Sequence, residues 1–293
     1  MNLLRAVADL AMPRECLGCG DELEAGQEYL CSACLEDLPK TRYWLLRENP
    51  MSESFNSLIQ RGMGDDVRYV PYGYAAALYF YRGGYREISK ALKYRRNFAA
   101  GEYFARMLGE TLAQSEWFRS VGLVVPVPLH WSRRWSRGYN QAEVIAREVA
   151  RCLGVPLGKG LLVRRRHTGT QTHLGLEDRA RNVAGAFRLT RKGRAMIASA
   201  SRPGHILLID DVYTTGATAA ACSAAFRYQT DCRQPHRSGS GLRPSSLPSC
   251  GWAPPADIAE GGMPPDGECL QSSPPGLAAP PRVSVATLAC VER

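Results

Sequence analysis

The stretch HILLIDDVYTTGATAAACSAAF, residues 205–226, contains the features that decide the fold of this chain. Residues 206–209 are a short apolar run that predicts a buried strand, and residues 219–226 have the composition of a helix. Two adjacent carboxylates and a turn rich in threonine and glycine lie between them. This order predicts an α/β unit that presents polar groups at the carboxyl end of a strand, where open α/β sheets bind ligands.

The turn carries the groups that bind a sugar phosphate. Backbone N–H groups at the start of the helix and three threonine hydroxyls can hold a phosphate. Asp210 and Asp211 would repel that phosphate, so we expect them to accept hydrogen bonds from sugar hydroxyls. The alternative is an ordinary strand–turn–helix junction that happens to be rich in threonine. The expected phosphate-binding residues are Thr214, Thr215, Gly216, Ala217 and Thr218.

The sequence DDVYTTGAT resembles the phosphoribosyl-pyrophosphate (PRPP) loop of type I phosphoribosyltransferases. The resemblance implies an α/β domain with the mainly parallel sheet of that family. It also implies that Asp210 and Asp211 are catalytic residues that hold the ribose hydroxyls and favour positive charge at C1, while the turn holds the 5′-phosphate. Mg²⁺ would then accompany PRPP as a hard cation bridging its oxygens.

The formal net charge of +9 comes almost entirely from arginine. Arginine suits bidentate contacts with phosphate groups, so the charge indicates an anionic ligand without singling out DNA. No apolar run has the length of a transmembrane helix, and residues 1–12 carry Asp9 and lack the apolar core of a signal peptide. We therefore expect a cytoplasmic protein without membrane insertion, whose first 12 residues form an amphipathic helix.

Four cysteines near the N-terminus have the spacing of a zinc ribbon, with two C-x2-C pairs on either side of eleven residues. Two such knuckles supply four thiolates in a tetrahedron. A redox pair or reduced structural thiols are the alternatives. We expect a structural zinc that folds a module over residues 1–40, which are too few to build a core unaided, with a short helix at the second pair. The expected ligands are Cys16, Cys19, Cys31 and Cys34.

The middle of the chain predicts a linker followed by a phosphoribosyltransferase-like domain over residues 71–227. The linker, residues 41–70, mixes polar, glycine and proline residues. The patterns that follow predict an edge strand over 72–81, helices over 86–94 and 98–112, a strand over 122–128 and a helix over 141–151.

Three arginines follow the strand expected at 122–128: Arg133, Arg134 and Arg137. Forked guanidinium donors suit the many oxygens of a pyrophosphate, although solvated arginines near a helix start are the alternative. A loop at this position binds the pyrophosphate of PRPP in the family that the chain resembles. These arginines are therefore our candidates for stabilising the departing pyrophosphate.

The string VPVPLH…R…RGYNQAE resembles the ComF (competence protein F)/GntX-like branch of this family. The residues after it also resemble that branch, which carries T-x-x-Q, then R-x-x-N and AF. Here these are Thr168, Gln171, Arg179, Asn182, Ala186 and Phe187. We expect the long polar stretch 167–182 to be a lid that excludes water from the substrate. The resemblance implies a role in DNA uptake and natural transformation, with a helicase-like partner and single-stranded DNA.

Three functions remain open from the sequence: a phosphoribosyltransferase, a nucleotide-binding module without catalysis, and a single-stranded DNA-binding accessory of a competence helicase. The segments RYWLL and HWSRRWSRGY would be the stacking platforms of the last, although packing is the simpler use of their aromatic rings. No residue is an evident general base, so the acceptor of phosphoribosyl transfer is unassigned.

The composition changes abruptly after residue 227. Residues 228–281 are rich in proline, glycine and serine and have no apolar period, which predicts either a disordered insertion or a segment produced by two compensating frameshifts. RVSVATLAC, residues 282–290, then alternates as a strand does. It resembles the last core strand of the family, so we assign residues 282–293 to the domain.

Overall fold

The computed structural model describes residues 14–62, 70–86, 88–89, 98–129, 139–164, 186–199, 203–228 and 281–292. They all belong to one compact unit, Met1–Asp231 together with Pro280–Arg293, whereas a second unit, Cys232–Ala279, lies outside the described residues. The elements in chain order are α2 Ser32–Glu36, η1 Tyr43–Leu45, α3 Pro50–Arg61, β1 Ala75–Phe80, α5 Phe98–Gln114, η2 Glu116–Phe118, β2 Leu123–Pro126, α7 Gln141–Leu153, β3 Leu162–Arg164, β4 Phe187–Leu189, α9 Arg191–Ala198, β5 His205–Tyr213, α10 Ala217–Tyr228 and β6 Arg282–Cys290.

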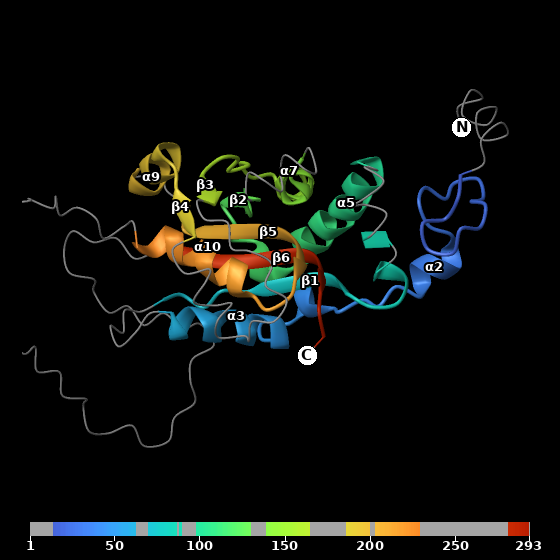
Figure 1. Ribbon diagram of the computed structural model, residues 1–293, viewed down its shortest axis with the longest axis horizontal. Coiled ribbons are helices and arrows are strands. Elements are labelled where there is room, and N and C mark those ends of the chain that lie inside the picture. The colour runs from blue at the N-terminus through green and yellow to red at the C-terminus, as the bar shows by residue number, and fades with distance from the viewer. Residues whose placement is uncertain are drawn as a thin grey trace, which may run out of the picture. The chain divides into compact units, whose positions relative to one another are not determined.

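The centre of the fold is a four-stranded sheet in the order β1-β6-β5-β2, and every neighbouring pair is parallel (Figure 1). This confirms the predicted α/β class and the mainly parallel sheet. β1 lies at an edge, as expected. β6, the last strand in the sequence, lies between β1 and β5, where Val285 pairs with both Ala75 and Leu208.

Helices cover both faces of the sheet. α5 and α7 pack on one face, where Leu108, Ala146 and Leu207 share a buried cluster. α3 and α10 pack on the other, where Phe55, Cys222 and Leu208 share a second cluster. Neighbouring strand residues such as Leu207 and Leu208 point to opposite faces, so one apolar strand supplies both clusters. The continuous apolar run of β5 is the result of this two-sided burial.

The expected linker over residues 41–70 is wrong for Pro50–Arg61, which forms helix α3. Its first turn is closed by a capping box, in which Ser52 N donates to Asn49 Oδ1 at 3.0 Å and Asn49 N donates to Ser52 Oγ at 2.9 Å. A serine replaces the usual glutamate or glutamine of that motif, so the signal is easy to miss. Asn49 Nδ2 also donates to Ala75 O at 2.9 Å, which fixes the start of α3 to β1.

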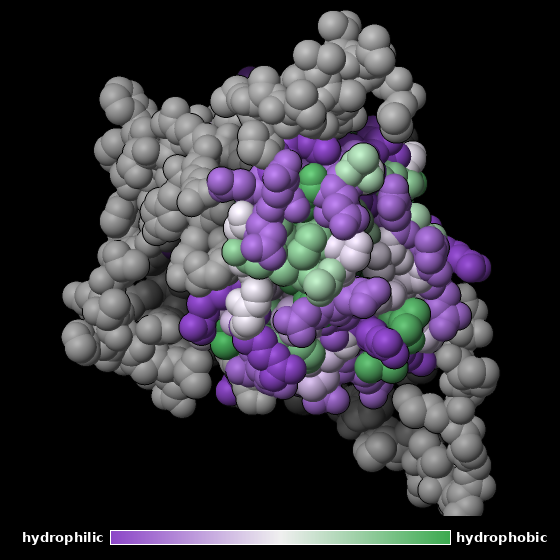
Figure 2. Space-filling view, turned by 90° about the vertical axis from the view of Figure 1, so that its right-hand side faces the viewer, coloured by the Kyte–Doolittle hydropathy of each residue, from purple (hydrophilic) through white to green (hydrophobic). Residues whose placement is uncertain are grey.

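A smaller antiparallel pair, β3 and β4, lies beside α10 and is followed by α9. The surface view in Figure 2 shows a mainly hydrophilic face on which hydrophobic residues gather in small separate groups. In the part of the chain that the structure describes, no helix is both long enough and apolar enough to cross a membrane.

Candidate functional site

The site expected from residues 210–218 lies where β5 and β2 run side by side. The chain leaves β5 for α10 on one face of the sheet, whereas it leaves β2 for α7 on the other face. Adjacent strands whose connections go to opposite faces create a crevice at their carboxyl ends, which is where open α/β sheets bind ligands. β2 ends at Pro126, opposite Ile209, so the last four residues of β5 extend beyond it. The acidic pair is therefore beside this crevice.

Asp210 and Asp211 lie within β5 rather than after it, because β5 stays paired with β6 as far as Tyr213. Both are partly exposed, and each bends toward the next residue: Asp210 Oδ1 accepts from Asp211 N at 2.9 Å, and Asp211 Oδ1 accepts from Val212 N at 2.8 Å. Each carboxylate therefore has one oxygen held by the backbone.

The two carboxylates lie toward opposite faces of the sheet. Burial, and then the charge of Asp210, raises the pKa of Cys222, which belongs to α10. Burial, and then the charge of Asp211, raises the pKa of Tyr85, which packs in the cluster of α5 and α7. The alternation of a strand explains this separation. A ligand at the carboxyl ends of the strands would contact Asp210 toward one face of the sheet and Asp211 toward the other.

The threonine-rich turn leads directly into the first turn of α10. Thr214 is exposed, Thr215 and Thr218 are partly exposed, and Gly216 and Ala217 are buried. Ala217 N donates to Thr215 Oγ1 at 3.4 Å, and Ala220 N donates to Gly216 O at 2.9 Å, which starts the helix. Gly216 has a φ of +78°, a left-handed conformation that favours glycine. The turn therefore connects β5 directly to α10 through a left-handed residue at Gly216.

Arg164 is a cation of this region that the sequence reasoning missed. Its guanidinium lies 5.4 Å from the centroid of the Phe187 ring, across the β3–β4 pair. Its positive charge also lowers the pKa of Cys222, opposing the larger effects of burial and Asp210. Arg164 therefore lies on the same face as Asp210. It follows an apolar strand in the sequence, but only the pairing with β4 brings it near α10.

Two groups of expected site residues lie outside the described residues: Arg133, Arg134 and Arg137, and the lid candidates Thr168, Gln171, Arg179 and Asn182. The structure does describe residues that shortly precede each group in the sequence. Val127 N donates to Ile209 O at 2.8 Å, so the segment that precedes the arginines leaves the sheet next to Asp210. Ala186 and Phe187, the AF pair of the motif, are buried.

The aromatic residues of RYWLL pack against the domain. Tyr43 makes an edge contact with Phe80, with ring centroids 5.7 Å apart. Trp44 is partly buried, and its carbonyl accepts from Ser115 Oγ at 2.6 Å. Leu45 and Leu46 are exposed, at 62% and 49%. This arrangement favours packing over base stacking for these rings.

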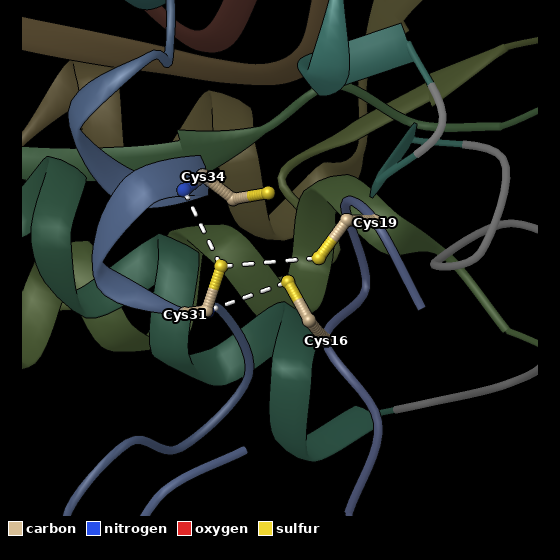
Figure 3. A group of neighbouring side chains, drawn as sticks. All are labelled: Cys16, Cys19, Cys31 and Cys34. Atoms are coloured by element: carbon tan, nitrogen blue, oxygen red, sulfur yellow. Dashed lines mark hydrogen bonds between the residues drawn. The ribbon is translucent and has the colours of Figure 1, made fainter. Parts of the chain in front are cut away.

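The four N-terminal cysteines converge on one point (Figure 3). Their sulfur atoms all lie within 4.8 Å of one another, which confirms the grouping expected from the spacing. The second knuckle starts helix α2, as predicted. A Cβ on Gly18 would lie 2.9 Å from Cys34 Sγ, so only glycine leaves room for the two knuckles to approach.

Backbone N–H groups donate to the sulfur atoms of Cys16 and Cys31. Gly18 N and Cys31 N donate to Cys16 Sγ at 3.4 and 3.3 Å, and Cys34 N donates to Cys31 Sγ at 3.4 Å. Burial alone would raise the pKa of Cys16, but hydrogen bonds with Cys19, Cys31 and Gly18 lower it to about 6, whereas burial and the neighbouring cysteines raise the pKa of Cys34. Four sulfurs at these distances can hold one tetrahedral zinc ion.

Comparisons with known proteins support the sequence assignment. No family model matches the chain. The chain is 33% identical over 129 residues to Competence protein F of Haemophilus influenzae, covering 43% of this chain and 54% of the relative. It is 36% identical over 135 residues to DNA utilization protein YhgH of Salmonella typhi, covering 44% and 55%. The chain thus spans about half the length of the curated relatives it matches. These similarities support a ComF-like family for this chain, as its motifs predicted.

Proposed function

We propose that this chain is a PRPP-binding, phosphoribosyltransferase-like protein that acts in DNA uptake. The observation that carries the proposal is the position of residues 210–218 at the carboxyl end of β5, beside the end of its neighbour β2. A sugar phosphate there would have carboxylates for its hydroxyls and backbone N–H groups for its phosphate. The family type of the sheet, a phosphoribosyltransferase type I domain, is part of this proposal.

Each expected site residue has a role in this scheme. Asp210 and Asp211 hold the ribose hydroxyls from the two faces of the sheet and favour the positive charge that develops at C1 as the pyrophosphate leaves. Thr214–Thr218 hold the 5′-phosphate through their N–H groups and hydroxyls. The arginines at 133, 134 and 137 bind the pyrophosphate end, and the lid residues exclude water. When bound with PRPP, Mg²⁺ would neutralise charge on the pyrophosphate oxygens.

The four cysteines bind a structural zinc in this proposal. Their module is joined to the α5 face of the domain, since Leu23 and Leu30 share the cluster of Phe104 and Leu108. Tyr29 and Tyr103 also meet, with ring centroids 5.2 Å apart. A closed four-thiolate site leaves no position for substrate, so the metal supports the fold rather than the reaction.

A second candidate is a nucleotide- or single-stranded DNA-binding accessory of a competence helicase, without catalysis. The names of the relatives favour it, because they refer to competence and DNA utilization and name no transferase reaction. His205, the described histidine, lies at the amino end of β5, away from Asp210, and so offers no general base to an acceptor.

Titration calorimetry with PRPP, with and without Mg²⁺, followed by a pyrophosphate-release assay, tests both candidates. We expect Mg²⁺-dependent heat from PRPP that is lost in the Asp210→Asn, Asp211→Asn double variant. Asp37→Asn, at the end of α2, is the matched control and should bind as the wild type does. Pyrophosphate release, assayed with nucleobases and amines supplied as phosphoribosyl acceptors, supports the enzyme, and binding without release in the presence of these acceptors supports the accessory. An absence of heat would overturn PRPP binding.

A further inference from the structure

We propose that Tyr213 is a positioning residue that holds the phosphate loop, Thr214–Thr218, in its binding form before a ligand arrives. The inference rests on the proposed function, because it assigns that loop to a phosphate. It concerns the last residue of β5, which lies between the acidic pair and the loop.

Both ends of Tyr213 are fixed. Its carbonyl accepts from Val291 N at 2.9 Å, and the residue pairs with Cys290 of β6. Its side chain is buried, with 6% exposed, and its Oη donates to Met51 O in the first turn of α3 at 3.4 Å. The ring therefore connects the end of β5 with the helix that covers that face of the sheet.

Gly216 lies directly on this ring. A Cβ placed on Gly216 would be 2.0 Å from Tyr213 Oη, 2.6 Å from Cζ and 3.0 Å from Leu58 Cδ1 of α3. Such separations are far below van der Waals contact, so the backbone of Gly216 fits against the phenol only because it has no side chain. Gly216 also has the left-handed φ that turns the chain into α10. The position of the Gly216 backbone is thus set by where the hydroxyl end of Tyr213 lies.

The support continues from α3 into the sheet. The start of α3 is fixed by the Asn49–Ser52 capping box and by the bond from Asn49 Nδ2 to Ala75 O. Tyr72 Oη adds a bond to Ser52 Oγ at 3.0 Å. Contacts therefore run from β1 through α3 and Tyr213 to Gly216. Groups that bind an anion are most effective when neighbouring residues already hold them in place.

The test compares Tyr213→Phe with Tyr79→Phe. Tyr79 is also a buried tyrosine, and its hydroxyl donates to Met107 Sδ on the α5 face, away from the loop. Calorimetry would use ribose 5-phosphate, which presents the phosphate of the loop, and inorganic pyrophosphate, which presents the other end of PRPP. We expect Tyr213→Phe to weaken ribose 5-phosphate by about fivefold and to leave pyrophosphate unchanged. Tyr79→Phe should change neither affinity.

Amide hydrogen exchange in the ligand-free protein gives a second measurement. Tyr213→Phe should speed exchange at Gly216, Ala217 and Thr218 relative to the centre of α10, whereas Tyr79→Phe should not. Unchanged exchange together with unchanged ribose 5-phosphate affinity overturns the positioning role, and so does equal weakening of both ligands. If the wild type binds neither PRPP nor ribose 5-phosphate, the proposed function fails, and the exchange rates still decide whether Tyr213 holds the loop.

Discussion

The cysteine module directs backbone N–H groups at its own sulfur atoms, and the loop Thr214–Thr218 is proposed to direct them at a phosphate, but the two sites are built differently. In the module, two knuckles within residues 16–34 bring all four sulfurs together. In the loop, the geometry depends on β5, on β6 from the far end of the sequence and on α3 from before the sheet. Local spacing therefore decides the first site, whereas tertiary packing decides the second.

The largest expected effect is the loss of a zinc ligand. Cys34→Ser removes one of four thiolates, and we expect zinc content to fall from about one ion per chain and thermal stability to drop by several kcal/mol, because zinc binding supplies folding free energy. Metal analysis and thermal unfolding measure both. Cys152→Ser, in α7 outside the cluster, is the control. Full zinc content in Cys34→Ser would contradict the four-cysteine site.

Gly216→Ala tests how strongly tertiary packing fixes the loop. Gly216 and Gly154 both have left-handed φ values, +78° and +66°, but a Cβ on Gly154 meets no atom within 4 Å. Gly154→Ala therefore costs only the backbone strain, about 1 kcal/mol. Gly216→Ala should cost about 1–3 kcal/mol more, because the methyl group meets Tyr213. Denaturant unfolding measures the difference. Equal losses of unfolding free energy in the two variants would show that Tyr213 does not restrict the loop.

His205 tests the opposite end of the same strand. Its ring bonds Ser120 Oγ at 2.8 Å and Ser284 Oγ at 2.7 Å, and so ties β5 to β6. Burial, and then the charge of Arg282, lowers the pKa of His205 to about 3. Below pH 6.5 the unfolded chain therefore takes up a proton that the folded chain does not, and stability falls as pH decreases toward 3.

This histidine changes the free energy of unfolding by at most about 1.4 kcal/mol per pH unit. Its contribution is constant at pH values above the pKa of the histidine in the unfolded chain. His205→Gln should remove this slope between pH 6.5 and 5, a window in which most carboxylates stay ionised. Unfolding free energies of the two proteins across this window provide the check. Parallel pH profiles would rule out a neutral buried His205.

The smallest effect concerns the contact between the cysteine module and the domain. Tyr29→Ala and Tyr103→Ala each remove one ring of the pair. A double-mutant cycle should give a coupling of about 0.5–1.5 kcal/mol, measured by thermal unfolding with zinc in excess. A coupling near zero would mean that the module is stabilised by its metal and not by this contact.

The regular elements were predictable because their patterns are local. The strands over 72–81, 122–128 and 282–290 and the helix over 141–151 follow from apolar period and are confirmed. The mainly parallel sheet was expected from the resemblance of the DDVYTTGAT stretch to the phosphoribosyltransferase loop, and the structure has such a sheet. Helix α3 was missed because the segment that contains it, residues 41–70, mixes polar, glycine and proline residues and because its cap uses serine, although Phe55 is fully buried.

The site was only partly predictable. The spacing of the cysteines identified the sulfur cluster, since two cysteines with two residues between them can lie on one knuckle. The order of β5 residues identified the acidic pair and the turn, but not the separation of Asp210 and Asp211 by the sheet. Tyr213 and Arg164 could not be found from the sequence, because α3 and β4 become their neighbours only on folding.

The central place of β6 has a consequence for how the protein is made. A ribosome delivers β1, β2 and β5 before β6, yet β1 and β5 have no strand between them until residues 282–290 emerge. Until β6 is synthesised, the nascent chain therefore exposes the unpaired edges of β1 and β5, and unpaired strand edges are the surfaces most prone to wrong pairing. The risk lies in the time of synthesis, when a chaperone that shields strand edges would be needed most.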